Sequence, residues 1–597
     1  WPLPSGSSVG SSSVRHMRST NGPRSVQHIA ATLRLWVDIS LSILSHLGVA
    51  AIKSMAKSEE AMLEEIGKMQ GPGGFDYVII CCSDLSAENF WQERLTQTIR
   101  EVTGTSSTVI CVHEDWNGGA GNGLGTLYAV VKACSKGEKL GVDLAKSLHE
   151  GKAVAIYHTA GKGTRLAPLP GAENNNKPGV KLPGLLSVNG RLEPITVLEC
   201  VLRQTSSYGA VRGGRCSVFW GDQIFVPSCG IQSSDYPADI LAALRPMPTK
   251  EQWEAEALHQ YGLIAVDSKG DAMQLEKVTY DIAKLYLPSE VKQVGTSLGS
   301  FSVSAALLDA LLAEFSQELA AKSGSLDSDP HFWMPLTMKK ADYRAVMGKK
   351  DVSATDADKH FDRMAAFKTR FSSSGGILGC VDVGQQAYWW DYGRLELYMR
   401  NNSLLTETSS SAFALRRFLG LESSKGRQQW NTLEHVEVHP SAVVLNCRIG
   451  SGRIGPGSVL VNVVAPQVTV ENCILVKVSS MVPIFGKGGL LYNVVEQRNS
   501  DLPCDAVRAD VFMPGGVHHK IYSTRSTDGG KVWKDTLPNN SYSFEGIYKA
   551  NQPLDVLECT QEANSAHENV GNKVMPLSSL KSLRVSVYSC CVARGCI

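Results

Sequence analysis

Glycines and basic residues that could bind a phosphate chain follow one short apolar run. Residues 153–157 predict a buried strand, and the loop after it contains Ala-Gly-Lys-Gly-Thr-Arg at residues 160–165. Glycines let backbone N–H groups approach a phosphate closely, and Arg165 can neutralise its charge. Lys177 and Lys181 follow soon after and add two further cations. The pattern predicts a site for a phosphate chain.

Two aspartates follow apolar stretches further along the chain. Asp222 ends the run at residues 217–222, and Asp391 lies in residues 388–402, where a helix is expected to begin. Mg²⁺ prefers carboxylate oxygens and keeps several waters, so one or two such ligands suffice. Two carboxylates brought together repel unless a cation lies between them. Each aspartate alone would be typical of a turn or a helix N-cap, and the two could hold a magnesium ion only if the fold brings them together.

The order of these segments carries a family resemblance. Residues 162–170 read Lys-Gly-Thr-Arg-Leu-Ala-Pro-Leu-Pro, residues 174–181 read Asn-Asn-Asn-Lys-Pro-Gly-Val-Lys, and Gly221-Asp222 and residues 388–402 come later. The chain resembles the sugar-1-phosphate nucleotidyltransferases, the pyrophosphorylases that make nucleotide sugars. Within that superfamily it looks most like the chloroplast-type UDP-glucose pyrophosphorylases.

The resemblance implies an enzyme that transfers a nucleotidyl group from an NTP, here UTP, to a sugar 1-phosphate, here glucose 1-phosphate, and releases pyrophosphate. It implies Mg²⁺ as the cofactor, held by Asp222 and Asp391. Arg165 and Lys177 take the catalytic roles, with Lys181 as the alternative lysine. The other implied contacts are to the nucleotide, from Ala160, Gly161, Gly163, Thr164 and Gly221, and to the sugar phosphate, from Glu276, Lys277 and Gly299.

Three positions depart from the family pattern. Ala160 stands where many members have glycine, Val278 replaces the proline after Glu-Lys, and Arg394 replaces a threonine. The form with Ala160 resembles the N-acetylglucosamine-1-phosphate uridylyltransferases, and a second Gly-rich segment at residues 118–127 resembles one in GDP-fucose pyrophosphorylases. The alternatives are therefore a fucose-type or N-acetylhexosamine-type pyrophosphorylase, or a catalytically silent regulatory subunit of the same fold.

Strand and helix patterns alternate around these residues. Residues 75–82 and 108–112 predict strands, and residues 87–102 and a segment ending near Cys134 predict helices. Such alternation predicts an α/β fold, a Rossmann-like and mostly parallel sheet with helices on both faces. Ligands of such sheets lie at the carboxyl ends of the strands, where both Gly-rich segments fall. Residues 118–127 are either a second phosphate or base contact or a tight structural turn.

A change in the pattern of apolar residues near Val436 predicts a second domain. Over residues 438–459 apolar residues recur at a spacing of roughly six, with Gly, Asn, Ser and Pro between them, as in a left-handed β-helix. A small irregular β-domain is the alternative. We divide the chain into a leader and N-terminal helix (1–72), a catalytic domain (73–405), a linker (406–430), a β-helix-like domain (431–520) and a C-terminal extension (521–597) without assigned function. Such coils often join subunits in the family, so a homo-oligomer is an open expectation.

The composition of the chain gives no sign of a nucleic-acid or membrane partner, so we expect small-molecule substrates. The net charge of +1 gives no overall electrostatic field that would attract nucleic acid or an anionic membrane. The hydrophobic content of 43% is ordinary for a globular protein. The apolar stretch at residues 35–52 contains Asp38 and His46, and we expect no membrane span. Residues 1–37 hold arginines and serines but no Asp or Glu, which is typical of an organelle transit peptide and equally of a disordered leader. The expected compartment is the plastid stroma or, otherwise, the cytoplasm.

Overall fold

The computed structural model describes residues 57–574, apart from 287–290, 372–375, 386, 423–425, 499–500 and 503. Trp1–Ser58 and Glu59–Ile597 are two separate units. The predicted leader (1–37) and the apolar stretch at 35–52 lie outside the described residues. Residues 59–69 are helical and bury Ile66 and Met69 in the core of the second unit. That part of the segment predicted as leader and N-terminal helix therefore belongs to the folded unit.

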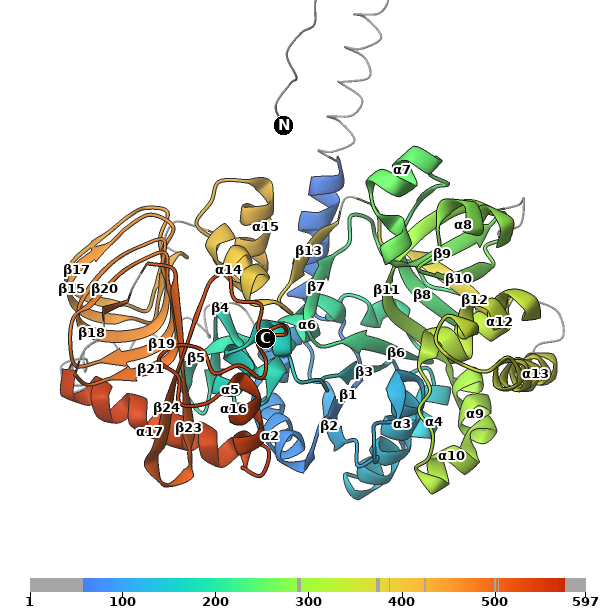
Figure 1. The fold of residues 1–597 in the computed structure, drawn as a ribbon, viewed down its shortest axis with the longest axis horizontal. Helices are drawn as coiled ribbons and strands as arrows, with labels where there is room; N and C mark the ends of the chain where they lie inside the picture. Colours follow the sequence, from blue (N-terminus) through green and yellow to red (C-terminus); the bar gives the residue numbers. More distant parts are fainter. Residues whose placement is uncertain are drawn as a thin grey trace, which may run out of the picture. The chain divides into compact units, whose positions relative to one another are not determined.

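The first sheet has a parallel half whose strands lie in the order β6-β3-β1-β2 (Figure 1). They are β1 (Tyr77–Cys82), β2 (Thr108–His113), β3 (Val154–His158) and β6 (Arg215–Trp220). The strands predicted at residues 75–82, 108–112 and 153–157 are confirmed, and so is the α/β class. None of the described helices combines the length and the apolar character needed to cross a bilayer.

The other half of this sheet is largely antiparallel, so the prediction of a mostly parallel sheet holds only for β6-β3-β1-β2. The long strand β11 (Val291–Ser304) pairs antiparallel with β6, β8 (Ala238–Pro246) and β9 (Gly262–Asp267). β10 (Ala272–Glu276) pairs antiparallel with β9 at the edge, and β12 (Leu378–Asp382) pairs parallel with β8. The turn between β9 and β10 is too short for a crossover helix, and a short connection forces antiparallel pairing.

The parallel strands are buried on both faces, which explains their continuous apolar sequences. Along β1, Val78 and Ile80 pack in one cluster with α2 (Leu85–Thr103) and α6 (Val197–Ser206), whereas Ile79 and Cys81 pack in another with α3 (Gly121–Lys139) and α9 (Ala305–Glu314). Helices therefore cover both faces, as predicted. The remaining helices of this part are α4 (Leu144–His149), α5 (Leu169–Ala172), α7 (Lys250–Ala255), α8 (Tyr280–Tyr286), α10 (Ser316–Ala321), α11 (Met334–Thr337), α12 (Lys340–Gly348) and α13 (Ala354–Phe371).

The second large sheet is built from successive coils that stack side by side (Figure 1). One column of parallel strands is β14 (Gln428–Gln429), β16 (Val443–Leu445), β18 (Val459–Glu471), β19 (Ile474–Ser480), β21 (Leu490–Glu496) and β23 (Ala506–Met513). A second column holds β15 (Thr432–Val438), β17 (Arg448–Ile454), part of β18, β20 (Ile484–Lys487) and β22 (Asp501–Leu502). The register places Val443 beside Val459 and Val459 beside Ile474. β24 (Val517–Thr524) pairs antiparallel with β23 and spans the predicted boundary at residue 520.

One corner of successive coils is occupied by residues with a left-handed backbone. They are Trp430, Asn446, Asn462, Lys477 and Asn493, with φ between +52° and +59°. Asparagine tolerates this conformation better than most residues, which explains the asparagines between the apolar residues of the coils. The side-chain amides of Asn446 and Asn462 hydrogen-bond each other at 2.9 Å, and each donates to the Leu192 carbonyl at 3.2 Å. This corner therefore joins the coils to the hairpin of β4 (Lys181–Val188) and β5 (Arg191–Thr196).

Helices on either side of the coils connect them to the first sheet. α14 (Leu395–Leu404) and α15 (Ser410–Phe418) precede the coils, and α15 buries Leu415 and Phe418 within the predicted linker. α16 (Phe544–Asn551) contacts α5, and α17 (Val556–Val574) packs on β19, β21 and β23 as well as on α2. The described part of the C-terminal extension thus contacts the coils and also α2, which packs on the first sheet.

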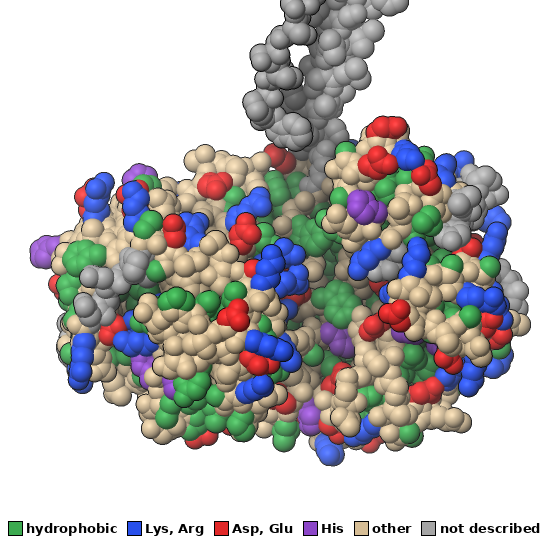
Figure 2. All heavy atoms as spheres, viewed as in Figure 1, with side chains coloured by type: hydrophobic (Ala, Val, Ile, Leu, Met, Phe, Trp, Pro, Cys, Tyr) green, Lys and Arg blue, Asp and Glu red, His purple; other side chains and the backbone are tan. Residues whose placement is uncertain are grey.

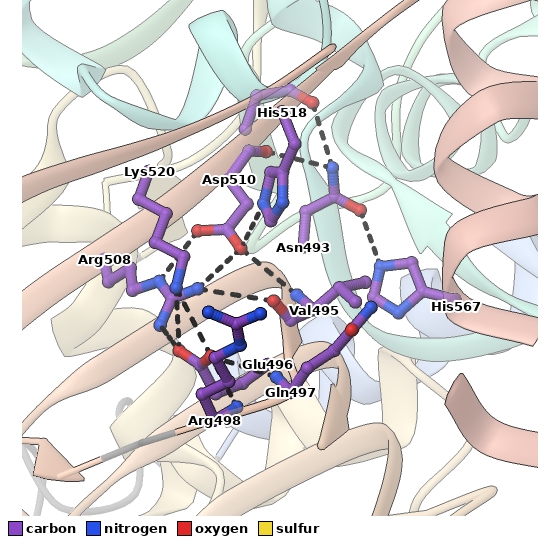
Figure 3. A network of polar contacts seen from close by, with 11 residues as sticks. Asn493, Val495, Glu496, Gln497, Arg498, Arg508, Asp510, His518, Lys520 and His567 are labelled. Carbon is purple, nitrogen blue, oxygen red and sulfur yellow. Dashed lines mark hydrogen bonds and ion pairs between the residues drawn. The ribbon is translucent and has the colours of Figure 1, made fainter. Parts of the chain in front are cut away.

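A buried ion network fixes β24 to the last coils (Figure 3). Arg508 donates to Asp510 Oδ1 at 2.8 Å and to Glu496 Oε2 at 2.6 Å, and Lys520 Nζ lies 3.0 Å from Glu496 Oε2. His518 Nε2 lies 2.8 Å from Asp510 Oδ2. Burial opposes ionisation of Glu496, but hydrogen bonds from Arg508 and Lys520 outweigh it and lower its pKa to about 2.

On the face in Figure 2, basic and acidic side chains are interspersed, in keeping with the net charge of +1.

Candidate functional site

The glycine-rich segment after β3 forms an open loop. Gly161 has φ of +126° and Gly163 of +62°, and the left-handed region of Gly163 suits glycine. A side chain on Gly163 would meet Lys177 Cγ at 3.1 Å, so the loop lies against the segment that carries Lys177. Thr164 begins a short 3₁₀ turn. The exposed residues of the loop are Ala160, Gly161, Lys162 and Arg165.

Gly221 and Asp222 continue the neighbouring strand β6. Because β3 and β6 are parallel, with His158 opposite Trp220, both strands end at the same edge of the sheet. Gly221 N–H donates to the His158 carbonyl at 3.1 Å, and a Cβ on Gly221 would lie 3.2 Å from that oxygen. Glycine allows this close approach, which brings Asp222 to the edge that carries the loop.

Asp222 and Asp391 converge on one point. The short strands β7 (Gln223–Val226) and β13 (Tyr388–Asp391) pair antiparallel, with Asp391 opposite Gln223. Tyr392 N–H donates to the Asp222 carbonyl at 3.3 Å. A Cβ on Gly393 would lie 3.0 Å from Asp391 Oδ1 and 3.5 Å from Asp222 Oδ2. The two oxygens can therefore be no further apart than the sum of these two distances.

Lys177, and not Lys181, faces this pair of carboxylates. Lys177 Nζ lies 2.6 Å from Asp222 Oδ2, and the two side chains are 18% and 28% exposed. Lys181 forms a buried ion pair with Glu173, which also accepts a hydrogen bond from the Tyr492 hydroxyl. The geometry thus separates the two lysines that the sequence left as alternatives and favours Lys177 at the site.

The loop at residues 160–165, Lys177, Asp222 and Asp391 form one contiguous group at the carboxyl edge of the sheet. No protein-family model and no curated protein matches this chain. Its function has to be inferred from the chemistry of its own residues.

The carboxylates of Asp222 and Asp391 are suitable as a pair of protein ligands for Mg²⁺. Asp222 Oδ2 accepts from Lys177 and Asp391 Oδ1 from the Gly393 N–H, and within the described residues the second oxygen of each carboxylate accepts no hydrogen bond. No group of three or more His, Cys, Asp or Glu in the described part of the chain could hold a metal ion. Mg²⁺ is commonly bound through one or two carboxylates with water completing its shell. Asp222 and Asp391 would hold it.

Gly299 lies against Trp220, the last residue of β6 before Gly221 and Asp222. It has φ of +72° at the irregularity in β11, and a Cβ there would lie 2.7 Å from Trp220 Nε1. The Trp220 ring lies over His158 with centroids 5.4 Å apart, and His158 Nε2 lies 2.8 Å from Thr126 Oγ1. Burial lowers the pKa of His158 to about 4, so its ring is neutral near pH 7. Gly299 therefore lies beside the strand end that leads into Asp222.

Lys277 lies at the edge of the same sheet. It follows β10 with φ of +51°, and its N–H donates to the Tyr261 carbonyl at 3.2 Å. β9 and β11 separate β10 from β6, which amounts to about 14 Å at the usual strand spacing. Val278 is buried, and its carbonyl accepts from Trp253 Nε1 at 3.3 Å. The side chain of Glu276 lies outside the described residues.

The Gly-rich segment at residues 118–127 is a helix start capped by other protein groups. Three of its backbone N–H groups donate to protein acceptors: Ala120 to Glu114 at 2.8 Å, Asn122 to Asp327 at 3.0 Å and Gly123 to Leu326 at 2.8 Å. A phosphate at a helix N-terminus would need such amides. Their occupation favours the tight structural turn over a second phosphate contact.

The C-terminal extension packs against the loop at Thr164 and Arg165, a contact that the sequence did not predict. A side chain on Gly529 would collide with the carbonyl oxygen of Thr164, and one on Gly530 would lie 3.5 Å from Arg165 Cγ. The sequence Asp528-Gly529-Gly530 was the one local signal, and a short turn of this kind does not reveal what it packs against.

A second contact ties the same extension to the segment between Arg165 and Lys177. Asn175 Nδ2 donates to the Tyr548 carbonyl at 2.7 Å, and Lys162 Nζ lies 5.3 Å from the centre of the Tyr548 ring. Asn551 Nδ2 donates to the Gly171 carbonyl at 2.9 Å. α16 therefore contacts the segment that follows the loop, as well as Lys162 within it.

Proposed function

We propose that this chain is a Mg²⁺-dependent sugar-1-phosphate nucleotidyltransferase that uses UTP and glucose 1-phosphate. The observation that carries the proposal is the convergence of Asp222 and Asp391 beside Lys177 and the loop at residues 160–165. A phosphate oxygen of the sugar phosphate bonds to the α-phosphorus of the nucleotide, and the bond from that phosphorus to the leaving pyrophosphate breaks. Such a reaction needs positioning and positive charge rather than a protein nucleophile.

The basic residues have separate tasks in this proposal. The backbone N–H groups of the loop around Gly161 and Gly163 hold the triphosphate, and Arg165 neutralises the charge that develops on pyrophosphate. Lys177 binds phosphate oxygens through Nζ, and Asp222 positions that ammonium at 2.6 Å. Mg²⁺ bound by Asp222 and Asp391 supplies further positive charge against the phosphate oxygens.

The antiparallel half of the first sheet is the proposed sugar-phosphate region. Gly299 lies against Trp220 next to Asp222, and Lys277 lies across β9 and β11 from that strand end. We assign the sugar phosphate to Gly299, Lys277 and Glu276, with the sugar lying between the two strand ends.

The architecture supports the same proposal at the level of the fold. We interpret the first sheet as a Rossmann-like nucleotidyltransferase domain and the stacked coils as a left-handed β-helix. The strand order β6-β3-β1-β2 and the parallel register of the coils support this interpretation. A plastid transit peptide at residues 1–37 belongs to the proposal, and import of a fluorescent fusion of these residues into isolated chloroplasts tests it.

A substrate panel tests the reaction. Pyrophosphate release is measured with Mg²⁺, the common NTPs and several sugar 1-phosphates. UTP with glucose 1-phosphate should be the best pair, and Arg165→Ala should lower its turnover at least about 100-fold. Arg453→Ala, which removes an arginine that is 66% exposed on β17, should leave turnover unchanged.

Three outcomes of the panel would revise the proposal. Near-wild-type turnover by Arg165→Ala would contradict the role of the loop. A preference for GTP with fucose 1-phosphate, or for an N-acetylhexosamine 1-phosphate, would assign the chain to one of those enzyme types. Binding of UTP without turnover on any pair would indicate a silent subunit.

A further inference from the structure

Lys477 interrupts the column of asparagines at the left-handed corner of the coils. Asn462 and Asn493 occupy this corner in the coils on either side. They donate to backbone carbonyls of the first part of the chain, Asn462 to Leu192 at 3.2 Å and Asn493 to Ala172 at 3.3 Å. A left-handed backbone is costlier for lysine than for asparagine. A strained residue of this kind points to a role beyond local folding.

The ammonium of Lys477 is buried against a neutral partner. The residue is 7% exposed, and Nζ donates to Asn564 Oδ1 of α17 at 2.7 Å. An ammonium has three N–H donors, and within the described residues this amide oxygen is its one hydrogen-bond acceptor. Burial lowers the pKa of Lys477 to about 8. A buried cation with unfilled donors is costly unless a ligand supplies acceptors.

Lys477 lines a cavity of about 340 Å³ between α2, the β4–β5 hairpin, β19 and α17. This volume is in the range of pockets that bind small organic ligands. Uncharged polar side chains line much of the wall, namely Gln97, Asn189, Thr196, Thr560, Gln561 and Asn564. The cavity can therefore offer hydrogen bonds to a polar ligand as well as the charge of Lys477.

The other cations of the cavity already have anionic partners. Arg94 pairs with Glu199 at 2.8 Å, Lys181 pairs with Glu173, and Arg191 pairs with Glu568. Lys477 forms no ion pair within the described residues. Burial, followed by the charges of Lys477 and Lys181, holds the pKa of His567 on α17 well below its usual range.

Glu93 and Glu193 also line the cavity, and they restrict what can bind. Their carboxylates accept hydrogen bonds and repel a second anion, so the part of a ligand near them must carry hydroxyl donors. A ligand with one anionic end and a hydroxyl-bearing body satisfies both requirements.

We propose that this cavity binds a small polyol phosphate, with its phosphate on Lys477 and its hydroxyls toward Glu93 and Glu193. The proposal does not depend on nucleotidyl transfer, because Lys477 and the two glutamates take no part in that reaction. Two residues that line the cavity, Glu173 and Lys181, flank Lys177 in the sequence.

Titration calorimetry on the full chain tests the proposal, with glycerol 3-phosphate and inorganic phosphate as probes. Glycerol 3-phosphate should bind wild type more tightly than inorganic phosphate. Lys477→Asn should weaken it at least about tenfold, the effect of one charged hydrogen bond. Asparagine occupies the same corner in the adjacent coils, so this variant should fold, and Lys477→Gln provides a second neutral variant. Arg165→Ala should bind the probe as wild type does.

Several results would overturn the proposal. Absence of binding to wild type would do so, as would equal affinities of wild type and both Lys477 variants. Binding lost in Arg165→Ala but retained in Lys477→Asn would place the probe on the nucleotide loop instead. Equal affinities for the two probes would show that the cavity recognises phosphate alone and refute the polyol assignment.

Discussion

Gly529 lies so close to Thr164 that a side chain on the glycine would overlap the carbonyl oxygen of the threonine. One residue belongs to the C-terminal extension and the other to the candidate nucleotide loop. Ala167, just beyond the loop, is buried in the same apolar cluster as Ile521 and Phe544 of the extension. The conformation of the loop is therefore fixed from outside its own domain, and the extension is part of the candidate active site.

Gly529→Ala should displace the loop backbone at Thr164. We expect turnover to fall about tenfold or more, because small misplacements of catalytic groups cost rate steeply. Overpacking should also lower the free energy of unfolding by about 1–3 kcal/mol. Pyrophosphate release and urea unfolding measure the two effects. Gly348→Ala is the matched control, since a Cβ there meets no atom within 4 Å. Unchanged turnover in Gly529→Ala would show that the extension does not position the loop.

The two lysines near the loop should respond differently to substitution. Lys177→Met should reduce turnover at least about 100-fold with little effect on unfolding, since Lys177 is part-exposed beside Asp222. Lys181→Met should instead lower the free energy of unfolding by about 3 kcal/mol, because it leaves Glu173 buried without its cation. Comparing turnover with urea unfolding separates the two roles. The reverse pattern would make Lys181 the catalytic lysine.

Much of the candidate site could be predicted from local sequence. The strand before residues 160–165, the apolar run before Asp222 and the helix start after Asp391 are all local patterns, and the structure contains each of them. The approach of the loop and Asp222 could be expected, because the parallel strands β3 and β6 end at one edge of the sheet. Asp391 instead reaches the site through the antiparallel pair of β7 and β13. The choice between Lys177 and Lys181 could not, since it depends on Glu173 and Tyr492, and Tyr492 lies in a distant coil.

Other features had no readable local signal. The antiparallel half depends on β11, whose pairing with β6, β8 and β9 is a property of tertiary structure. The docking of residues 528–551 on the loop involves glycines and amides that are typical of any turn. The sequence revealed the coils only in part. Different residue types, namely asparagine, glycine and lysine, occupy their left-handed positions, and the spacing of the apolar residues alone is irregular.

Gly393→Ala should disturb the proposed metal site. Its Cβ would lie 3.0 Å from Asp391 Oδ1 and 3.5 Å from Asp222 Oδ2, so one carboxylate must move. We expect the affinity for Mg²⁺ to fall by about tenfold, the effect of weakening one charged ligand. Competition with Mn²⁺, followed by electron paramagnetic resonance, measures this affinity without turnover. Gly348→Ala, where the backbone is not left-handed and a Cβ meets nothing within 4 Å, controls for the substitution itself. Equal affinities would remove Gly393 and its two aspartates from the metal site.

The ion network at the last coils should make stability depend on acid pH. The pKa of Glu496 is lowered from 4.5 to about 2, so its contribution is present above pH 4.5 and is lost as pH falls toward 2. Between these values wild type should lose about 1–3 kcal/mol more than Glu496→Gln. Urea unfolding along the pH series measures the difference. Glu437→Gln, which alters an exposed carboxylate on β15, should follow wild type. Parallel curves for wild type and Glu496→Gln would mean that the network contributes no acid dependence.

The buried charge of Lys477 should destabilise the folded protein at neutral pH and cease to do so at alkaline pH. Its pKa is lowered from 10.5 to about 8 by burial, so the cost of its buried charge is fully present below pH 8 and disappears as pH rises toward 10.5. The charged and titratable groups around it are Glu93 and Arg94 on α2, Glu173 before the hairpin, Lys181, Arg191 and Glu193 in the hairpin, and His567 on α17. Lys477→Asn should therefore be more stable than wild type by about 1–3 kcal/mol at pH 7, with the difference shrinking between pH 8 and 10.5. Urea unfolding of both proteins at pH 7 and near pH 10 measures it. A variant less stable than wild type at pH 7 would show that the bond to Asn564 outweighs the buried charge, and that Lys477 is an anchor for α17.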